Sequence, residues 1–219
     1  MTDDFRAVVR AALAAQGDAK RAAGQQAYMK SAMPFYGVPV PQVRSIVRGL
    51  AKGFDLNRIR ACSLELWDGA ARREERYAAL ALTGLKAAAG RLELVDLHEY
   101  QARTGAWWDF TDEIAHRIAD LLDAHPAETA KVVRHWAVDE SMWVRRLALL
   151  SQLQRHERTS TALLTELIDL NAGRPEFFIR KAIGWALRDY ARTDPAWVRA
   201  FVDAHCLSPL SRREALKHL

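Results

Sequence analysis

The chain has 219 residues, 50% of them hydrophobic and 27% charged, so it can bury a sizeable core and is neither disordered nor fibrous in composition. It has no long uncharged apolar run and opens with acidic residues, so we expect a soluble cytoplasmic protein rather than a membrane or secreted one. The net charge is +5, with 25 arginines against 7 lysines, which suits a polyanionic partner, although GC-rich coding produces the same bias.

Apolar residues recur at spacings of three and four along the whole chain, which predicts helices and leaves no segment for a sheet. Short connections predict that these helices form antiparallel pairs stacked in series. The expected fold is therefore all-α, a superhelical solenoid of HEAT-like helix pairs in a single domain, 1–219. In chain order, the predicted helices cover residues 3–16, 19–31, 39–51, 55–67, 71–88, 91–102, 108–123, 126–137, 141–156, 159–171, 176–191, 195–205 and 209–218.

A phrase made of an aromatic residue, a β-branched residue and two cations occurs twice, at 143–146 and 178–181, so its copies are 35 residues apart. This step loosely matches HEAT-like helix pairs, whose concave wall is where a partner binds. Adjacent cations lie about 100° apart on a helix, and burying an unpaired charge is costly. We therefore expect at least one cation of each copy to reach solvent or a ligand.

The segment 106–113 places two tryptophans beside several acids. Asp109 is predicted to cap the helix that follows, where a carboxylate meets free N–H groups. Trp108 and Asp112 are four residues apart, so they are predicted to project from one helix face, an indole beside a carboxylate. Aromatic residues at the start of a helix usually belong to the hydrophobic core, and acids there usually interact with the helix dipole. The segment alone therefore leaves open a purely structural role for Trp108 and Asp112.

Gly184 lies inside a predicted helix, where glycine costs about 1 kcal/mol relative to alanine. This cost predicts that another segment approaches the backbone closely there, with the neighbouring Trp185 in a cleft. Four other tryptophans lie in apolar helical patterns and are expected in the core: Trp67, Trp136, Trp143 and Trp197.

Cysteine and histidine usage argues against a metal centre. Cys62 and Cys206 have no nearby cysteine or histidine at a ligand spacing, and the seven histidines are scattered. We expect the cysteines to be packing residues, and we expect no metal or other cofactor.

Motifs along nearly the whole chain occur in an order typical of one family. They are Ala27-Tyr28-Met29-Lys30, Glu65-Leu66-Trp67, Trp107-Trp108-Asp109-x-x-Asp112, Trp143-x-x-Arg146-x-Ala148, Glu176-Phe177-Phe178-Ile179-x-Lys181-Ala182-Ile183-Gly184-Trp185 and Leu207-x-Pro209-Leu210-Ser211-x-Arg213-Glu214-Ala215-x-Lys217. Together they resemble the bacterial DNA alkylation repair family, the AlkD-like alkylpurine DNA glycosylases. The resemblance implies a superhelix of HEAT-like repeats whose concave basic face binds duplex DNA, and removal of N3- and N7-alkylated purines without a metal.

The resemblance also implies roles for individual residues. Asp112 would be the catalytic carboxylate, Arg146 a cation that holds a backbone phosphate, and Trp108 and Trp185 the aromatic walls of the cleft, with Tyr28 as a further lining residue. A carboxylate suits the chemistry because the sugar becomes cationic as the base leaves. Candidates for the remaining phosphate contacts are Arg44, Arg145, Arg180, Lys181, Arg188, Arg212, Arg213 and Lys217.

The expected partner is double-stranded DNA that contains alkylated purines, bound by a monomer that leaves an abasic site. Two other interpretations stay open. One is a non-catalytic binder of damaged or branched DNA on the same scaffold, which a neutral residue in place of Asp112 would favour. The other is a HEAT-like protein scaffold, which predicts an apolar groove rather than a basic one.

Overall fold

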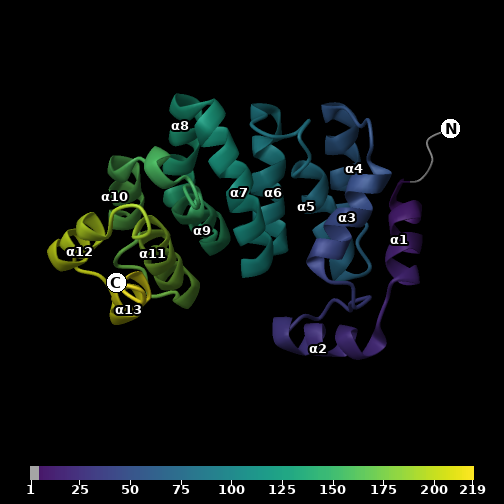
Figure 1. Ribbon diagram of the computed structural model, residues 1–219, viewed down its shortest axis with the longest axis horizontal. Helices are drawn as coiled ribbons and strands as arrows, with labels where there is room; N and C mark the ends of the chain where they lie inside the picture. Colours follow the sequence, from purple (N-terminus) through teal and green to yellow (C-terminus); the bar gives the residue numbers. More distant parts are fainter. Residues whose placement is uncertain (1–4) are drawn as a thin grey trace. The chain divides into compact units, whose positions relative to one another are not determined.

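The computed structural model describes residues 5–219, and the chain divides into two compact units, Met1–Ala89 and Gly90–Leu219. The described residues form thirteen α-helices and two short 3-10 helices, without a strand (Figure 1). The predicted all-α fold of helical repeats is confirmed. A single domain over the whole chain stays a prediction. No helix within residues 5–219 is both long and apolar enough to cross a bilayer.

The first unit is a five-helix group in which α3 packs against α1 and α5, and α4 packs against α5. Its helices have apolar stripes at four-residue spacing, such as Val9 and Leu13 on α1 and Val43 and Val47 on α3, and all four side chains are fully buried. The helices are α1 (Phe5–Ala15), α2 (Ala19–Met29), α3 (Val40–Leu50), α4 (Leu56–Asp68) and α5 (Arg73–Thr83).

A buried carboxylate fixes the segment that leads from α2 to α3. Glu74 on α5 accepts hydrogen bonds from the backbone N–H groups of Tyr36, Gly37 and Val38 at 2.9, 2.7 and 3.0 Å. Gly37 has a φ of 89°, and a Cβ there would lie 2.1 Å from the carbonyl oxygen of Asp18, so the turn requires glycine. The Glu74 carboxylate thereby fixes the segment that connects α2, the helix that carries Tyr28, to α3.

The second unit contains the remaining helices. They are the 3-10 helix η1 (Leu92–Leu94), α6 (Val95–Gly105), α7 (Trp108–Ala124), α8 (Pro126–Ala137), α9 (Met142–Leu150), the 3-10 helix η2 (His156–Arg158), α10 (Thr161–Asp169), α11 (Phe177–Tyr190), α12 (Pro195–Ala204) and α13 (Pro209–Ala215).

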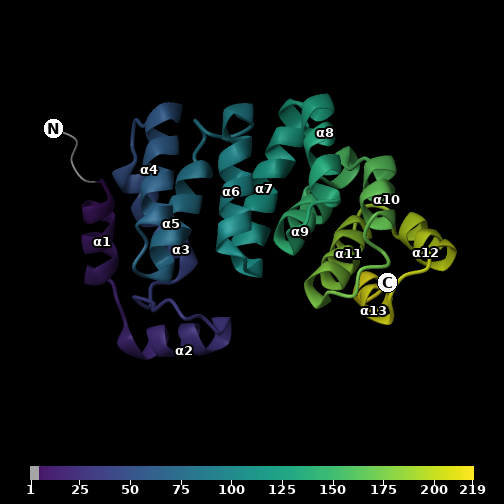
Figure 2. The ribbon, with the colours of Figure 1, turned by 180° about the vertical axis from the view of Figure 1, so that it is seen from behind.

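Alternate helices of the second unit form a continuous row. Helix α7 packs against α9, α9 against α11, and α11 against α13, while α8 and α10 pack beside this row (Figure 2). The two copies of the repeated phrase begin at the second residues of α9 and α11, so they occupy equivalent places in neighbouring repeats. Side chains that point from one of these four helices to the next therefore bring together residues far apart in the sequence.

The predicted helices all exist, but three of them end three or more residues before their predicted ends. Helix α5 ends at Thr83, before Gly84, and α13 ends at Ala215. Helix α9 ends at Leu150, and it could not extend to residue 156 because Gln154 and His156 have φ values of 62° and 52°, which a right-handed helix cannot contain. The predicted start of the first helix at residue 3 lies outside the described residues.

The connection between α6 and α7 passes through a left-handed alanine. Ala106 has a φ of 46° and a ψ of 41°, and its N–H donates to the carbonyl of Ala102. Glycine usually occupies this position, because a Cβ is crowded in the left-handed region. The strained residue directly precedes Trp107 and so sets the direction in which α7 begins.

Ala106→Gly is therefore expected to raise the free energy of unfolding by about 1 kcal/mol, because it removes the Cβ from the left-handed turn. Urea unfolding of the purified protein measures the change. The matched control is Ala200→Gly, an exposed position inside α12, which is expected to lower stability by about the same amount. Equal destabilisation by both substitutions would contradict the claim of strain at Ala106.

Candidate active site

A bidentate ion pair joins α7 to α9. The two carboxylate oxygens of Asp112 accept hydrogen bonds from Nε and Nη2 of Arg146 at 2.8 and 2.9 Å. The third guanidinium nitrogen, Nη1, donates to the backbone carbonyl of Phe178 on α11 at 2.7 Å. The Arg146 side chain is 3% exposed and that of Asp112 is 13% exposed. Arg146 is thus a buried cross-link between three helices, and the carboxylate is the part of the pair that reaches solvent.

Burial raises the pKa of Asp112 above its ordinary value, since it disfavours the charged form of the carboxyl group. The hydrogen bonds and the positive charge of Arg146 oppose this rise, Asp109 adds to it, and His116 lowers the pKa. Desolvation is the largest of these effects. The carboxylate therefore lies in a low-dielectric site, where its charge acts on nearby groups more strongly than in water.

Two indoles belong to the same row of helices. Trp185 on α11 is 36% exposed, and the Cζ atom of Arg146 lies 6.0 Å from the centre of its ring system. Trp108 is half-buried and is the first residue of α7, one helical turn before Asp112. The predicted pairing of Trp108 and Asp112 on one helix face follows, because α7 is helical from its first residue. The structure thus brings Asp112, Arg146 and Trp185 together across three helices.

An aromatic cluster holds the start of α7 in place. The ring of Trp107 lies 6.0 Å from that of Trp143 on α9 and 5.8 Å from that of Phe178 on α11, and the last two rings are 5.0 Å apart. Tilted and edge-to-face pairs at these distances contribute about 0.5–1.5 kcal/mol each beyond the area that they bury. The cluster therefore fixes the position from which Trp108 and Asp112 project.

The expectation that Asp109 caps α7 is wrong. The N-cap residue is Trp107, which makes no side-chain capping hydrogen bond, and the helix already includes Trp108 and Asp109. The helix begins directly after the left-handed turn at Ala106, two residues earlier than a cap at Asp109 would require. Asp109 instead lies in the first turn, where a negative charge favours the positive end of the helix dipole.

The expectation that one of the adjacent cations Arg145 and Arg146 must reach solvent is also wrong. The Arg145 side chain is only 5% exposed. It donates hydrogen bonds to the carbonyl groups of Asp139 and Glu140 at 2.6 and 2.9 Å and pairs with Glu176. Both cations are buried because each has its own acceptors, which a sequence cannot show. Arg145 is therefore a structural residue and not a candidate for contact with a phosphate.

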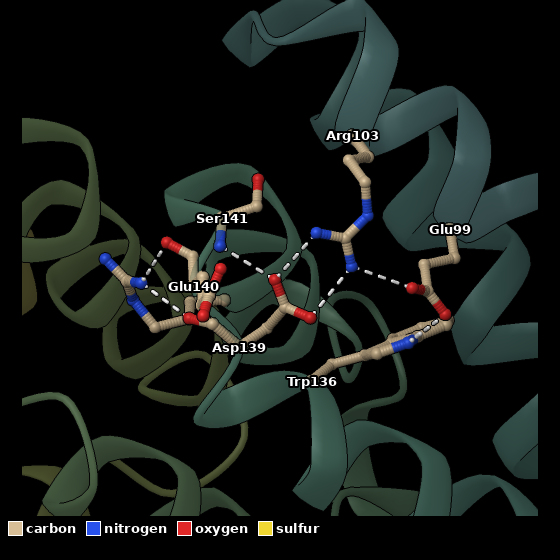
Figure 3. Close-up of polar contacts among 7 residues, drawn as sticks. Glu99, Arg103, Trp136, Asp139, Glu140 and Ser141 are labelled. Atoms are coloured by element: carbon tan, nitrogen blue, oxygen red, sulfur yellow. Dashed lines mark hydrogen bonds and ion pairs between the residues drawn. The ribbon is translucent and has the colours of Figure 1, made fainter.

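The same α8–α9 turn is tied to α6 by a chain of polar contacts (Figure 3). The Asp139 carboxylate accepts hydrogen bonds from Arg103 and from the N–H of Ser141, and Arg103 also pairs with Glu99 at 2.8 Å. Glu99 accepts from Nε1 of Trp136 at 2.9 Å. The hydrogen bonds from Arg103 lower the pKa of Asp139. These polar contacts fix the turn before α9, and so they help to position Arg146 on that helix.

An acid on α13 binds two of the cations that were predicted to contact phosphates. Glu214 pairs with Arg188 at 3.0 Å and with Lys181 at 3.8 Å. Lys181 is 44% exposed, and Arg188 is 18% exposed. Lys181 and its neighbour Arg180, which is half-buried, thus satisfy the expectation that one cation of this copy reaches solvent.

The remaining predicted cations are exposed and lie in different parts of the chain. Arg212 pairs with Asp203 and with the carbonyl of Val202, whereas Lys217 follows the end of α13 and so does not share a helix with Arg213. The residues predicted in the first unit, Tyr28 and Arg44, are both exposed, Tyr28 by 75%.

The close approach predicted at Gly184 is confirmed, because a Cβ there would lie 2.5 Å from the Cβ of Glu214 on α13.

Of the four tryptophans expected in the core, Trp67, Trp136 and Trp143 are buried, whereas Trp197 is half-buried between Tyr190 and Phe201. Cys62 is buried as expected, but Cys206 is exposed, because it follows the end of α12 in an open connection.

Sequence reasoning missed two partners of the site. The carbonyl of Phe178 leaves no signal in a sequence, because every residue has one. Glu214 belongs to the last of the family motifs, but the sequence predicts no role for it. The one signal that pointed to it was Gly184, whose missing side chain required a neighbour that the sequence could not identify.

The fold and this site define a class of protein: a helical-repeat protein in which a part-buried carboxylate, held by a buried arginine, lies near an exposed indole. The DNA alkylation repair enzyme family matches residues 9–219. The chain belongs to this family, and its role is in the repair of alkylated DNA.

Solved structures agree with this membership. A structure described as a predicted DNA alkylation repair enzyme from Enterococcus faecalis is 31% identical over 93% of this chain and 96% of that chain, with a TM-score of 0.81. The structure of smu.31 from Streptococcus mutans UA159 is 15% identical over 82% of this chain and 92% of that chain, with a TM-score of 0.63, and it shows similarity of fold alone. No curated protein matches the chain.

Proposed function

We propose that the protein is a monofunctional DNA glycosylase that hydrolyses the N-glycosidic bond of cationic N3- and N7-alkylated purines in duplex DNA. The observation that carries this proposal is the Asp112 carboxylate, which is 13% exposed and is fixed by Arg146, whose Cζ atom lies 6.0 Å from the centre of the exposed ring of Trp185. Family membership supplies the substrate class in its coarser form, alkylated DNA. The fixed carboxylate supports the proposed hydrolysis, because cleavage of the N-glycosidic bond leaves a cationic sugar.

The chemistry needs little from the protein beyond a well-placed negative charge. An alkylated purine that carries a positive charge is a good leaving group, so the glycosidic bond breaks with cationic character on C1′ and the ring oxygen of the sugar. A fixed carboxylate in a low-dielectric site stabilises that charge as it develops. Asp112 has this character, since Arg146 binds both oxygens of its carboxylate and the side chain is only 13% exposed.

The contacts with Arg146 favour an electrostatic role for Asp112. A carboxylate has about four lone-pair positions, and Arg146 occupies two of them. The remaining positions can accept a hydrogen bond from the attacking water and orient it. Because Arg146 already binds both carboxylate oxygens, we assign the larger contribution to stabilisation of the sugar cation rather than to removal of a proton from water.

The burial of Arg146 changes the role that we assign to it. Its three contacts, to Asp112 and the carbonyl of Phe178, leave it 3% exposed, so a DNA phosphate cannot reach it without breaking the ion pair. We assign it the task of orienting Asp112. The indoles of Trp108 and Trp185 would attract the cationic nucleotide through their faces, by about 0.5–2 kcal/mol each.

The decisive experiment incubates the protein with duplex DNA that contains N7-methylguanine and measures the free base by chromatography. Undamaged duplex is the control, and EDTA in the buffer tests the expected independence from metal. A monofunctional enzyme leaves abasic sites, so the damaged strand should break only after alkali treatment. The monomer is checked by light scattering in the same buffer.

Release of N7-methylguanine, with strand breakage only after alkali, would support the proposal. Tight binding to the damaged duplex without release of the base would overturn it in favour of a non-catalytic binder of damaged or branched DNA. Absence of both release and binding would favour a protein scaffold.

A further inference from the structure

Trp185 lies close to two arginines, and an acid holds each of them. The Cζ atoms of Arg146 and Arg188 are both 6.0 Å from the centre of the Trp185 ring system. Asp112 on α7 binds the first arginine, and Glu214 on α13 binds the second at 3.0 Å. The indole thus lies near two ion pairs, Asp112–Arg146 and Glu214–Arg188. The chemistry proposed above gives no role to the Glu214–Arg188 pair.

Helix α13 is brought to this place by a specific close contact with α11. The backbone of Gly184 leaves room that any side chain would fill, since a Cβ there would lie 2.5 Å from the Cβ of Glu214 and 2.7 Å from the carbonyl oxygen of Ser211. The hydroxyl group of Ser211 donates to the carbonyl of Arg180 at 2.8 Å. The cost of glycine inside α11 therefore has a purpose: it lets the Glu214 side chain reach the cations around Trp185.

Glu214 pairs with two cations that lie on either side of Trp185 in the sequence of α11. Its side chain is 15% exposed and pairs with Arg188 at 3.0 Å and Lys181 at 3.8 Å. Lys181 lies one helical turn before Trp185 on α11, and Arg188 lies three residues after it, so the two cations flank the indole on one helix face. Without Glu214, both cations could turn towards phosphates, and the guanidinium beside Trp185 would lose its fixed place.

We propose that Glu214 is a positioning residue of the glycosylase site: it holds Arg188 against Trp185 and keeps Lys181 and Arg188 from binding phosphates indiscriminately. This inference rests on the proposed function, because it concerns how the indole wall of that site is held. Glu214 does not touch the reacting atoms. Glu214 lowers the general affinity of the protein for DNA and, in doing so, keeps the Trp185 side chain ordered.

The test is Glu214→Gln, which keeps the shape of the side chain and removes its charge. We expect tighter binding to undamaged duplex, with a salt dependence that is steeper by about 0.9 in the log–log slope for each cation that gains a phosphate. At saturating protein, the single-turnover rate of base release should fall about three- to tenfold, because the indole is less ordered. Acrylamide should quench Trp185 more strongly, measured as the difference between each protein and its Trp185→Phe counterpart.

The matched control is Glu166→Gln, which removes an equal charge from an ion pair of the same unit, 2.8 Å from Arg134 on α8. It should leave the quenching of Trp185 and the release rate unchanged. A second variant, Arg188→Gln, should increase the quenching of Trp185 without a steeper salt slope. If Glu214→Gln does not fold, the quenching of Trp185 in Arg188→Gln tests whether the Glu214–Arg188 pair orders the indole.

The proposal is overturned if Glu214→Gln binds undamaged DNA as the control variant does, or if affinity and rate fall together with the unfolding midpoint, which is the pattern of a merely structural residue. A wild-type protein that releases no base would overturn the proposed function instead. Binding, salt slope and quenching would still decide the role of Glu214 in that case.

Discussion

Asp112→Asn is expected to slow the release of N7-methylguanine by at least about a hundredfold, which corresponds to about 2.7 kcal/mol of lost stabilisation of the transition state. The reason is that the amide keeps the volume of the side chain but removes the charge that faces the sugar cation. Single-turnover release from a lesion duplex at saturating protein measures the effect, because this rate does not depend on binding or on product release.

The control for this substitution is Asp120→Asn, which removes an equal charge from the same helix at a 42% exposed position. It should leave the release rate within about twofold of the wild type, as expected for an exposed charge. Circular dichroism and the unfolding midpoint should show that both variants are folded. A release rate that is unchanged in folded Asp112→Asn would remove Asp112 from the mechanism.

The pH dependence of the reaction follows from the same carboxylate. The anion is the active form, so the rate is lost as the pH falls through the pKa of Asp112 in the folded protein. Burial raises that pKa, so the acidic loss of activity should begin at a higher pH than an exposed aspartate would give. Single-turnover rates between about pH 4 and pH 8, corrected for the uncatalysed loss of base, measure the midpoint. A rate that stays constant to the acidic end of this range would contradict the assignment.

Arg146→Met is expected to lower the free energy of unfolding by about 3–5 kcal/mol at neutral pH, because it leaves the Asp112 carboxylate without its partner in a buried place. It also leaves the Phe178 carbonyl without the Nη1 donor. Urea unfolding measures the loss. The pKa of Asp112 in this variant should rise further, since burial then acts without opposition from the guanidinium.

The sign of the pH effect on Arg146→Met follows from this raised pKa. The folded carboxyl group holds its proton more tightly than the unfolded one, so the variant loses stability as the pH rises through that range. Its deficit relative to the wild type should therefore be smaller at about pH 5 than at about pH 7.5. The double variant Asp112→Asn/Arg146→Met removes both charges and should cost less than the sum of the two single changes. Additive costs would mean that the pair is not coupled.

The helices were predictable because their signals are local. Apolar residues at helical spacing produced the buried stripes of α1 and α3, and the caps at Asp194 and Ser208 mark the starts of α12 and α13 with residues that bind free N–H groups. The helix ends were less predictable. The left-handed residue Gln154 prevents the predicted helix from continuing after α9, and glutamine is not a residue that usually signals such a turn.

The members of the site were predictable only in part, because its contacts join residues about one repeat apart. Arg146 and Asp112 are 34 residues apart in the sequence, and Arg145 and Glu176 are 31 apart. The motif identified Asp112 and Arg146 by resemblance, but not that the arginine is buried. The burial of Arg145 depends on backbone carbonyl groups at the α8–α9 turn. Every residue has a carbonyl group, so no residue type in the sequence indicates this contact.

The row formed by α7, α9, α11 and α13 supplies one side chain each to this site: Asp112, Arg146, Trp185 and Glu214. Each helix keeps its own backbone hydrogen bonds, whereas the geometry around the indole depends on the spacing between neighbouring repeats. Flexing of the stack by a fraction of an ångström would therefore loosen the ion pairs while every helix stayed intact. The geometry of the site thus depends on the packing between neighbouring repeats as well as on the stability of each helix.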